Sequence, residues 1–244
     1  MAATDLFEPF SDTSAEPAVR GFLHRTIDTT CVGTAAFGRP AGHSSADFPY
    51  GNDALVLTHG AGADCQSALL IVVASAFADI GFDVLRCDLP YRQQRPFGPP
   101  RPGDATRDRA GLRNAVSALR KIASGRIFLG GHSYGGRQAS MLCAEQPGLV
   151  DGLLLLSYPL HPPRKSAQLR TQHLPNLQTP ALFVHGTRDP FGSIEEIEAA
   201  LRLIPAKTLL VPVEAVGHDL GFKGKVRNES LASTVQERFC SFFG

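Results

Sequence analysis

The chain has 244 residues, of which 43% are hydrophobic, so it is long enough to bury one sizeable core. Its formal net charge is +1 and it contains no block of like charges, which argues against a protein that binds nucleic acid through a basic surface. The longest apolar stretch, residues 68–78, is too short to span a bilayer, so we also expect no membrane partner.

The N-terminus and the cysteines indicate the compartment. The first 17 residues lack the basic start and the apolar segment of a signal peptide. The five cysteines are odd in number and show no close pairing, which disfavours a disulfide framework and a CxxC zinc site. We therefore expect a reducing, cytoplasmic location.

The first part of the chain gives weak structural signals. Residues 1–19 are polar and contain prolines, so we expect a flexible lead-in, followed by a single domain over residues 20–244. Residues 19–37 are rich in Thr, Val and Phe and could form a hairpin, whereas residues 38–53 are typical of a loop.

From residue 53 onward, short apolar runs alternate with segments of helical periodicity. The apolar runs predict buried strands at residues 54–60, 82–90, 126–131, 152–159, 181–186 and 208–213. The periodic segments predict helices at residues 69–80, 112–123, 137–146, 194–204 and 231–242. Strands that are apolar along their whole length are buried on both faces, so the pattern predicts an α/β fold with a mostly parallel sheet and helices on both faces.

Residues 130–136, GGHSYGG, lie between a predicted strand and a predicted helix. Gly131, Ser133 and Gly135 fit the Gly-x-Ser-x-Gly nucleophile elbow, in which the serine occupies the apex of a tight turn at positive φ. The helix dipole there favours a developing negative charge. The alternative is a glycine-rich turn in which Ser133 only caps the helix. A phosphate cradle is disfavoured because neither GxxxxGK[ST] nor GxGxxG occurs.

A serine nucleophile needs a base within hydrogen-bond reach and an acid that orients the base. Asp189 follows the strand predicted at 181–186, and His218 follows the last predicted strand. Both residues therefore belong to the edge of the sheet where ligands bind in open α/β folds. Singly, Asp189 could be a turn former before Pro190 and His218 an ordinary loop histidine. Together with the elbow they predict a catalytic triad of Ser133, His218 and Asp189.

An oxyanion hole needs two backbone N–H donors. We expect one from Tyr134, which follows the nucleophile, and one from Ala61, in the glycine-rich loop after residues 54–60; Gly62 is the alternative second donor. Five further residues that end or follow predicted strands are candidates for substrate binding: His59, Gly60, His132, Tyr158 and Arg95.

Several motifs resemble a known family. The segments THGAGAD, GGHSYGGR, SYPLHPP, HLPNLQTPALFVHGTRDPFG and GHDL are similar to a small dienelactone-hydrolase-like branch of the α/β-hydrolase superfamily, which includes testis-expressed and KAT8-complex-type hydrolase domains. The resemblance extends from about residue 53 to the C-terminus and implies the α/β-hydrolase fold with a minimal lid and the triad. True dienelactone hydrolases carry a cysteine where this chain has Ser133, so their lactone specificity is not implied.

Other reactive side chains have simpler interpretations. His59, His132 and His185 all end strands and could meet at one edge, but the sequence has neither HxH nor HExxH spacing, so we expect no metal. Cys65 lies near a helix start, where a thiolate would be favoured, although a small buried residue is the simpler interpretation.

Two loops could border the site. Residues 91–109 contain five arginines, which could select a carboxylate or phosphate on the substrate or simply be solvated: Arg92, Arg95, Arg101, Arg107 and Arg109. Residues 161–175 occupy the usual place of a lid but are too few for a cap domain, which favours an open site for small substrates.

The sequence thus predicts a cofactor-free serine hydrolase that cleaves an ester or related acyl bond of a small-molecule substrate through an acyl-enzyme. The alternatives are a catalytically silent, hydrolase-like binding or scaffold module, and an acyltransferase that uses the same triad.

Overall fold

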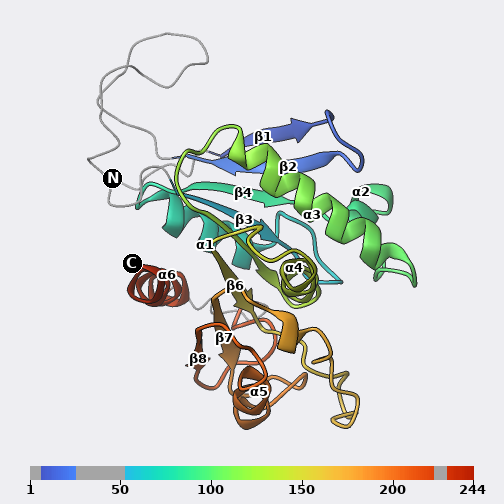
Figure 1. Cartoon of the computed structure of the whole chain (residues 1–244), viewed down its shortest axis with the longest axis vertical. Helices are drawn as coiled ribbons and strands as arrows, with labels where there is room; N and C mark the ends of the chain where they lie inside the picture. Colours follow the sequence, from blue (N-terminus) through green and yellow to red (C-terminus); the bar gives the residue numbers. More distant parts are fainter. Residues whose placement is uncertain (1–6, 26–52, 223–229) are drawn as a thin grey trace.

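The computed structural model describes residues 7–25, 53–222 and 230–244, which form one eight-stranded sheet with helices on both faces (Figure 1). The strand order is β1-β2-β4-β3-β5-β6-β7-β8. The pairs β1–β2 and β2–β4 are antiparallel, and all other neighbouring pairs are parallel, which confirms the predicted fold class. The strands are β1 Phe7–Asp12, β2 Val19–His24, β3 Ala54–Thr58, β4 Asp83–Cys87, β5 Ile127–His132, β6 Gly152–Leu156, β7 Ala181–Gly186 and β8 Thr208–Val213.

The helices divide between the two faces of the sheet. One face is covered by α1 and α6, and the other by α3, α4 and α5 (Figure 1). The short helix α2 follows β4, and the single turn η2 precedes β7. The bounds are α1 Ala68–Ala78, α2 Pro90–Gln94, α3 Asp104–Arg120, α4 Tyr134–Glu145, η2 Leu174–Asn176, α5 Ile194–Leu201 and α6 Ser230–Phe243.

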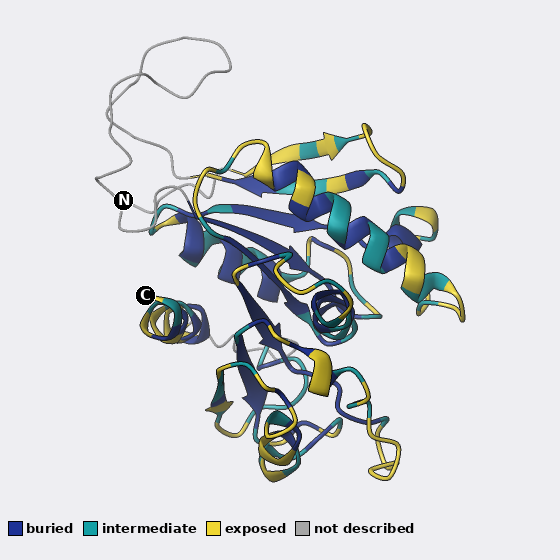
Figure 2. Ribbon diagram, viewed as in Figure 1, coloured by how far each residue is buried: buried dark blue, intermediate teal, exposed yellow. Residues whose placement is uncertain are grey.

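The centre of the sheet is the core of the molecule. Every residue of β3, β6 and β7 is buried, as the near-continuous apolar runs predict (Figure 2). On the α1/α6 face, the Phe239 ring meets those of Phe77 and Phe128 in edge-to-face geometry, with centroids 4.9 and 4.8 Å apart. This packing fixes the sheet, whose carboxyl-terminal edge carries the candidate site.

The expected flexible lead-in over residues 1–19 is wrong for residues 7–12. These residues form β1, which pairs with β2 from Phe7 opposite His24 to Asp12 opposite Val19. β1 is an edge strand with mostly exposed residues, and it contains Pro9, which an edge strand tolerates. Such a strand needs no apolar run, so the sequence pattern does not reveal it. The sheet therefore begins before residue 20, and residues 26–52, most of the predicted hairpin and loop, lie outside the described part.

The expected loop over residues 91–109 is largely helical. α2 begins at Pro90, where the fixed φ of proline suits a first helical turn. α3 begins at Asp104, after Gly103 at φ 96°, and the acidic side chain is favourable beside the helix N-terminus. The apolar stripe that predicts a helix over residues 112–123 is only the second half of α3.

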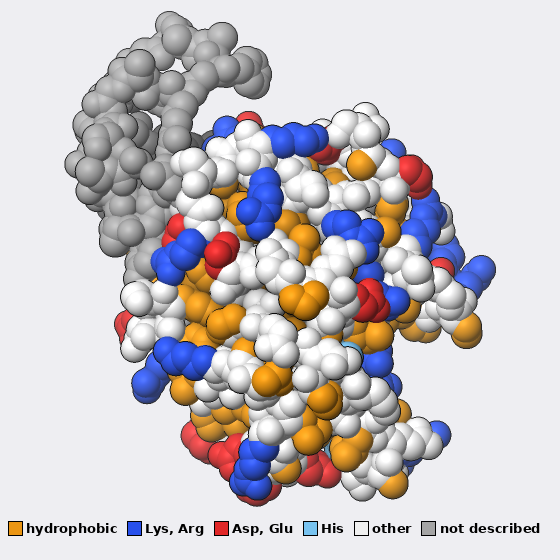
Figure 3. Space-filling view, viewed as in Figure 1, with side chains coloured by type: hydrophobic (Ala, Val, Ile, Leu, Met, Phe, Trp, Pro, Cys, Tyr) orange, Lys and Arg blue, Asp and Glu red, His pale blue; other side chains and the backbone are white. Residues whose placement is uncertain are grey.

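The surface agrees with the balanced charge of the sequence. Basic and acidic side chains are interspersed over the face in Figure 3. In residues 7–25, 53–222 and 230–244, no helix has the length and apolarity that a membrane span requires.

Candidate active site

Ser133 lies at the turn between β5 and α4. Its backbone has φ 52° and ψ −116°, a conformation that L-residues rarely adopt. The turn is held from both sides, because the Ser133 N–H donates to the Leu156 carbonyl and its own carbonyl accepts from the Arg137 N–H, at 2.8 and 2.9 Å. The strained conformation that the elbow motif predicts is therefore present.

The glycines of the elbow allow close backbone approach. A Cβ on Gly135 would lie 2.5 Å from the His59 carbonyl oxygen, and one on Gly131 would lie 2.8 Å from the Thr58 carbonyl oxygen. The crowding is therefore mainly against the end of β3, and to a smaller extent between the two glycines themselves. These contacts place the elbow directly beside the loop that follows β3.

The structure brings Ser133, His218 and Asp189 into one hydrogen-bonded line. His218 Nε2 lies 2.7 Å from Ser133 Oγ, and His218 Nδ1 lies 2.7 Å from Asp189 Oδ2. Nδ1–H donates to the carboxylate, so Nε2 can accept the serine proton. The Asp189 side chain is fully buried, and its other oxygen accepts from the Phe191 N–H at 2.9 Å.

The imidazole of His218 is held by aromatic neighbours and by its own backbone. The Phe191 ring lies 4.1 Å from it, centroid to centroid, and the His132 ring lies 5.2 Å away. His132 Nε2–H donates to the His218 carbonyl at 2.8 Å. His132, a candidate for substrate binding, therefore supports the loop that carries His218.

The loop after β3 brings Gly60 against the elbow. A Cβ at Gly60 would lie 2.8 Å from His132 Nδ1 and 3.4 Å from Ser133 Cβ. Within the described residues, the backbone N–H groups of Ala61 and Tyr134 have no hydrogen-bond acceptor. The Gly60 carbonyl accepts from His59 Nδ1–H at 2.9 Å and from the Ala63 N–H at 3.1 Å. Because C=O and N–H of a trans peptide point in opposite directions, the Ala61 N–H points away from the interior of the loop.

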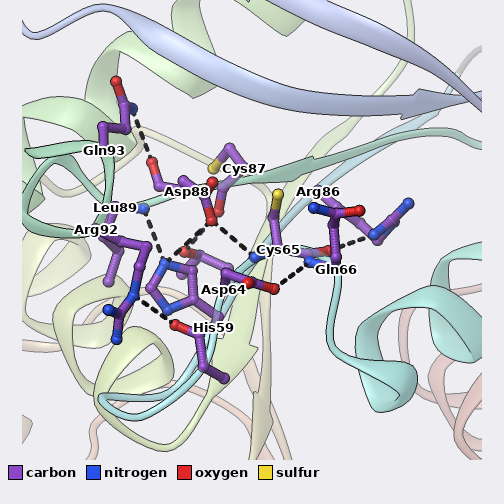
Figure 4. A network of polar contacts seen from close by, with 12 residues as sticks. His59, Asp64, Cys65, Gln66, Arg86, Cys87, Asp88, Leu89, Arg92 and Gln93 are labelled. Atoms are coloured by element: carbon purple, nitrogen blue, oxygen red, sulfur yellow. Dashed lines mark hydrogen bonds and ion pairs between the residues drawn. The ribbon is translucent and has the colours of Figure 1, made fainter. Parts of the chain in front are cut away.

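A polar network pins this loop to the segment after β4 (Figure 4). His59 Nε2 accepts from the Leu89 N–H at 3.1 Å, and Asp88 Oδ1 accepts from the Cys65 N–H at 2.8 Å. Both ring nitrogens of His59 are thus used in its neutral form, and burial lowers its pKa. His59 therefore helps to hold the loop after β3 in place.

Arg92 is the centre of the network. Its Nε donates to the Ala63 carbonyl at 2.9 Å, and its Nη2 donates to the Ala61 carbonyl at 3.1 Å (Figure 4 shows the Arg92 side chain directed at this loop). The same guanidinium also donates to the carbonyls of Arg95 and Gly98, at 3.1 and 3.0 Å. Four donors on backbone carbonyls leave this arginine no role as a free substrate-binding cation.

Asp108, which was not predicted as a site residue, links the segment after β4 to the start of α4. Its carboxylate is fully buried and accepts from the Tyr91 N–H at 3.0 Å and the Tyr134 hydroxyl at 2.8 Å. Tyr91 in turn donates its hydroxyl to the Ala61 carbonyl at 2.9 Å. Burial raises the pKa of Asp108. Its sequence signal is an acid on the apolar stripe of α3, four residues before Leu112.

Tyr158 and Arg95, two further candidates for substrate binding, make contacts within the protein. The Tyr158 ring is buried against Phe183, and its hydroxyl donates to the Arg170 carbonyl at 3.2 Å. Arg95 forms an ion pair with Asp104. Three further arginines of residues 91–109 also have partners: Arg92 as above, Arg107 with Glu16 and Arg109 with Glu145.

The histidines and Cys65 have ordinary environments. His185 Nε2–H donates to the Gly192 carbonyl at 2.8 Å, and burial lowers its pKa. The described residues contain no group of three or more His, Cys, Asp or Glu side chains arranged to hold a metal. Burial raises the pKa of the Cys65 thiol, which favours the interpretation of a small buried residue over that of a thiolate.

A mostly parallel sheet, a serine at a strand–helix elbow, an acid and a histidine in that chain order define the class of α/β hydrolases. Residues 51–241 match the family model of an alpha/beta hydrolase domain. The chain therefore belongs to this family, and the superfamily inferred from its motifs is confirmed.

Solved structures with the same fold cover nearly the whole chain. A dienelactone hydrolase from Anabaena variabilis is 18% identical, with a TM-score of 0.68 and 98% of each chain covered. Est1E from Butyrivibrio proteoclasticus is 14% identical, with a TM-score of 0.67 over 96% of this chain and 98% of that one. XC6422 from Xanthomonas campestris, described as a serine hydrolase without a lid, is 13% identical, with a TM-score of 0.67 over 99% and 96%. These identities establish a shared fold; the narrower KAT8-complex-type branch stays a prediction.

Proposed function

We propose that the protein is a serine hydrolase that cleaves an ester or related acyl bond of a small molecule. The observation that carries this proposal is the unbroken line from Ser133 Oγ through the His218 imidazole to Asp189, with 2.7 Å at each step. A buried carboxylate that orients a histidine, which in turn contacts a strained serine, suits nucleophilic catalysis better than helix capping.

The proposed reaction follows from these positions. Ser133 Oγ attacks the acyl carbon while His218 Nε2 takes its proton, and Asp189 stabilises the imidazolium. The N–H groups of Tyr134 and Ala61 donate to the tetrahedral oxyanion. His218 then protonates the leaving group, which departs and leaves an acyl-enzyme. Water, deprotonated by His218, attacks the ester, and the proton returns to Ser133 as the acid is released.

Two features support the assignment of the oxyanion donors. The N–H groups of Tyr134 and Ala61 lack an acceptor within the described residues. The loop that carries Ala61 is also held by Tyr91 and Arg92, so its donors are preorganised and lose little free energy to rearrangement during the reaction.

A fluorophosphonate probe tests the nucleophile. We expect labelling of the native protein at Ser133, no labelling of Ser133→Ala, and retained labelling of Ser75→Ala, which removes a buried hydroxyl of α1 on the other side of the sheet. For 4-nitrophenyl acetate, Ser133→Ala should lower kcat by about a millionfold if the three residues act as a unit. A native protein that is neither labelled nor active would instead be a silent binding module. Ester products with added alcohols would indicate acyl transfer.

A further inference from the structure

Arg137 lies near the candidate site and has no anionic partner among the described residues. Arg137 is on the first turn of α4, four residues after Ser133. It forms no ion pair with any described residue, and its Nε is buried without a hydrogen-bond partner. By contrast, Arg92, Arg95 and Arg109 all have partners in the protein. A buried guanidinium donor that remains unpaired is costly, so Arg137 calls for an acceptor from outside the chain.

The groups around Arg137 form a polar cluster between α4 and the segment after β6. Ser140 Oγ donates to the Arg137 carbonyl at 2.9 Å and accepts from His173 Nε2–H at 2.8 Å. The Tyr158 hydroxyl donates to the Arg170 carbonyl, and α4 contacts η2, which follows His173. These bonds hold the walls of the cluster; the Arg137 side chain also interacts with the Tyr158 hydroxyl, and its Nε is left without a hydrogen-bond partner.

The cluster is positively charged. Arg170 forms no ion pair with any described residue, and its Nη1 has only the Pro159 carbonyl, at 3.3 Å. Burial and then the charge of Arg137 lower the pKa of Arg170. Burial, Arg137 and Arg109 lower the pKa of His173 to about 4, so its imidazole is neutral at pH 7. Glu145, at the C-terminal end of the same helix as Arg137, is paired with Arg109 and is half exposed.

We propose that Arg137 and Arg170 form a subsite for an anionic group, a carboxylate or phosphate, carried by the substrate. Guanidinium groups bind both anions through paired N–H donors. The inference rests on the proposed function, because it makes the cluster part of a substrate site.

The position of Arg137 suits a group remote from the reacting bond. Four residues of helix separate it from Ser133, about 6 Å along the axis. Tyr158 lies two residues past the end of β6, at the same edge of the sheet as the elbow. An acyl chain of a few carbons with a terminal anion would reach from the Ser133 hydroxyl toward this cluster.

Matched esters test the subsite. 4-Nitrophenyl hydrogen glutarate and 4-nitrophenyl pentanoate have acyl chains of equal length, and only the first carries a carboxylate. We expect the native protein to have a higher kcat/KM for the glutarate ester than for the pentanoate ester. Arg137→Ala and Arg170→Ala should each lower this ratio of kcat/KM values about 10-fold to 100-fold, because each variant loses a hydrogen bond to a charged group. Arg101→Ala, at an exposed position of the neighbouring loop, should leave the ratio unchanged.

Direct binding separates this proposal from the hydrolase itself. Calorimetric titration with inorganic phosphate needs no turnover. If the native chain binds phosphate and Arg137→Ala does not, the result supports the anion subsite, even if no ester is hydrolysed. Loss of hydrolysis alone would then overturn only the proposed function. Equal kcat/KM for the two esters, or an unchanged ratio in both arginine variants, would overturn the subsite while the hydrolase stands. Phosphate bound to Arg137 without any preference for the anionic ester would also overturn it, because the anion would then not belong to the substrate.

Discussion

If Ala61 donates to the oxyanion as proposed, replacing Arg92 should lower kcat by disturbing the loop that carries Ala61, and not by disturbing the triad. Arg92 contacts neither Ser133 nor His218, but it holds the carbonyls of Ala61 and Ala63. In Arg92→Ala these carbonyls lose their donors, and the turn that aims the Ala61 N–H becomes free to rearrange. In the proposed function, Arg92 is thus a positioning residue.

The structure sets the size of the effect. Four hydrogen bonds from one charged group, each worth about 1.5–3 kcal/mol, are lost from a side chain that is only 8% exposed. These energies are not additive, and local opening of the loop absorbs part of the loss. We therefore expect Arg92→Ala to lower the free energy of global unfolding by about 2–4 kcal/mol. Loss of one oxyanion donor costs about 100-fold to 1,000-fold in kcat.

Steady-state kinetics with 4-nitrophenyl acetate, below the melting temperature of each variant, is the assay. We expect kcat of Arg92→Ala to fall about 100-fold while KM changes little, because the donor acts on the transition state. Arg92→Lys keeps the charge, but a single ammonium nitrogen replaces the planar guanidinium group with its several N–H donors. Its kcat should therefore lie between those of Arg92→Ala and the native protein. Arg101→Ala, an exposed arginine of the same loop, is the matched control. A folded Arg92→Ala protein with native kcat would refute the reasoning, as would a loss explained entirely by its unfolded fraction.

Three further predictions concern the loop, the charged cluster and the core. Gly60→Ala should lower kcat at least tenfold with an intact fold, because the new Cβ would meet His132 Nδ1 at 2.8 Å beside the nucleophile; native activity would contradict this. The pKa of His173 is lowered from 6.5 to about 4, so the unfolded chain binds more protons between these values and stability falls as pH drops through that window. Because His173 is partly exposed, we discount its share to about 1–2 kcal/mol; His173→Gln should flatten urea-unfolding stability between pH 6.5 and 4, and an unchanged slope would contradict it. Phe239→Ala should destabilise the fold by about 3–5 kcal/mol in the same assay, with a loss below 1 kcal/mol as the contrary result.

The sequence predicts the parts of this fold in which local pattern and burial coincide. Strands β3, β5, β6 and β7 are buried on both faces, so their apolar runs suffice. Asp189 and His218 could be placed near Ser133 because residues that follow parallel strands share one edge. β1 could not be predicted, because an exposed edge strand with a proline carries no comparable pattern.

The sequence pattern also does not show in which direction a side chain near the site points. Tyr158 follows β6 as a site residue would, but its ring turns into the core against Phe183. Arg92 and Arg95 have similar local sequence, and only the fold shows that one holds backbone carbonyls and the other an acid. Asp108 was the recoverable exception, because an acid on the apolar stripe of α3 already requires buried partners.

The positions of the two kinds of arginine suggest how charge is divided around the site. Arg92 is not available to bind a substrate anion, because it already donates four hydrogen bonds to backbone carbonyls. In the proposed function, these carbonyls must stay in place so that the Ala61 N–H keeps its direction toward the oxyanion. In the part of the chain that the structure describes, the buried Nε of Arg137 has no hydrogen-bond partner, one helical turn behind the nucleophile. A site that needed only apolar acyl chains would gain nothing from keeping that donor unpaired, since its desolvation is a cost to folding. This unpaired donor supports the proposal that Arg137 binds an anionic group of the substrate, whereas the proposed function makes Arg92 a positioning residue.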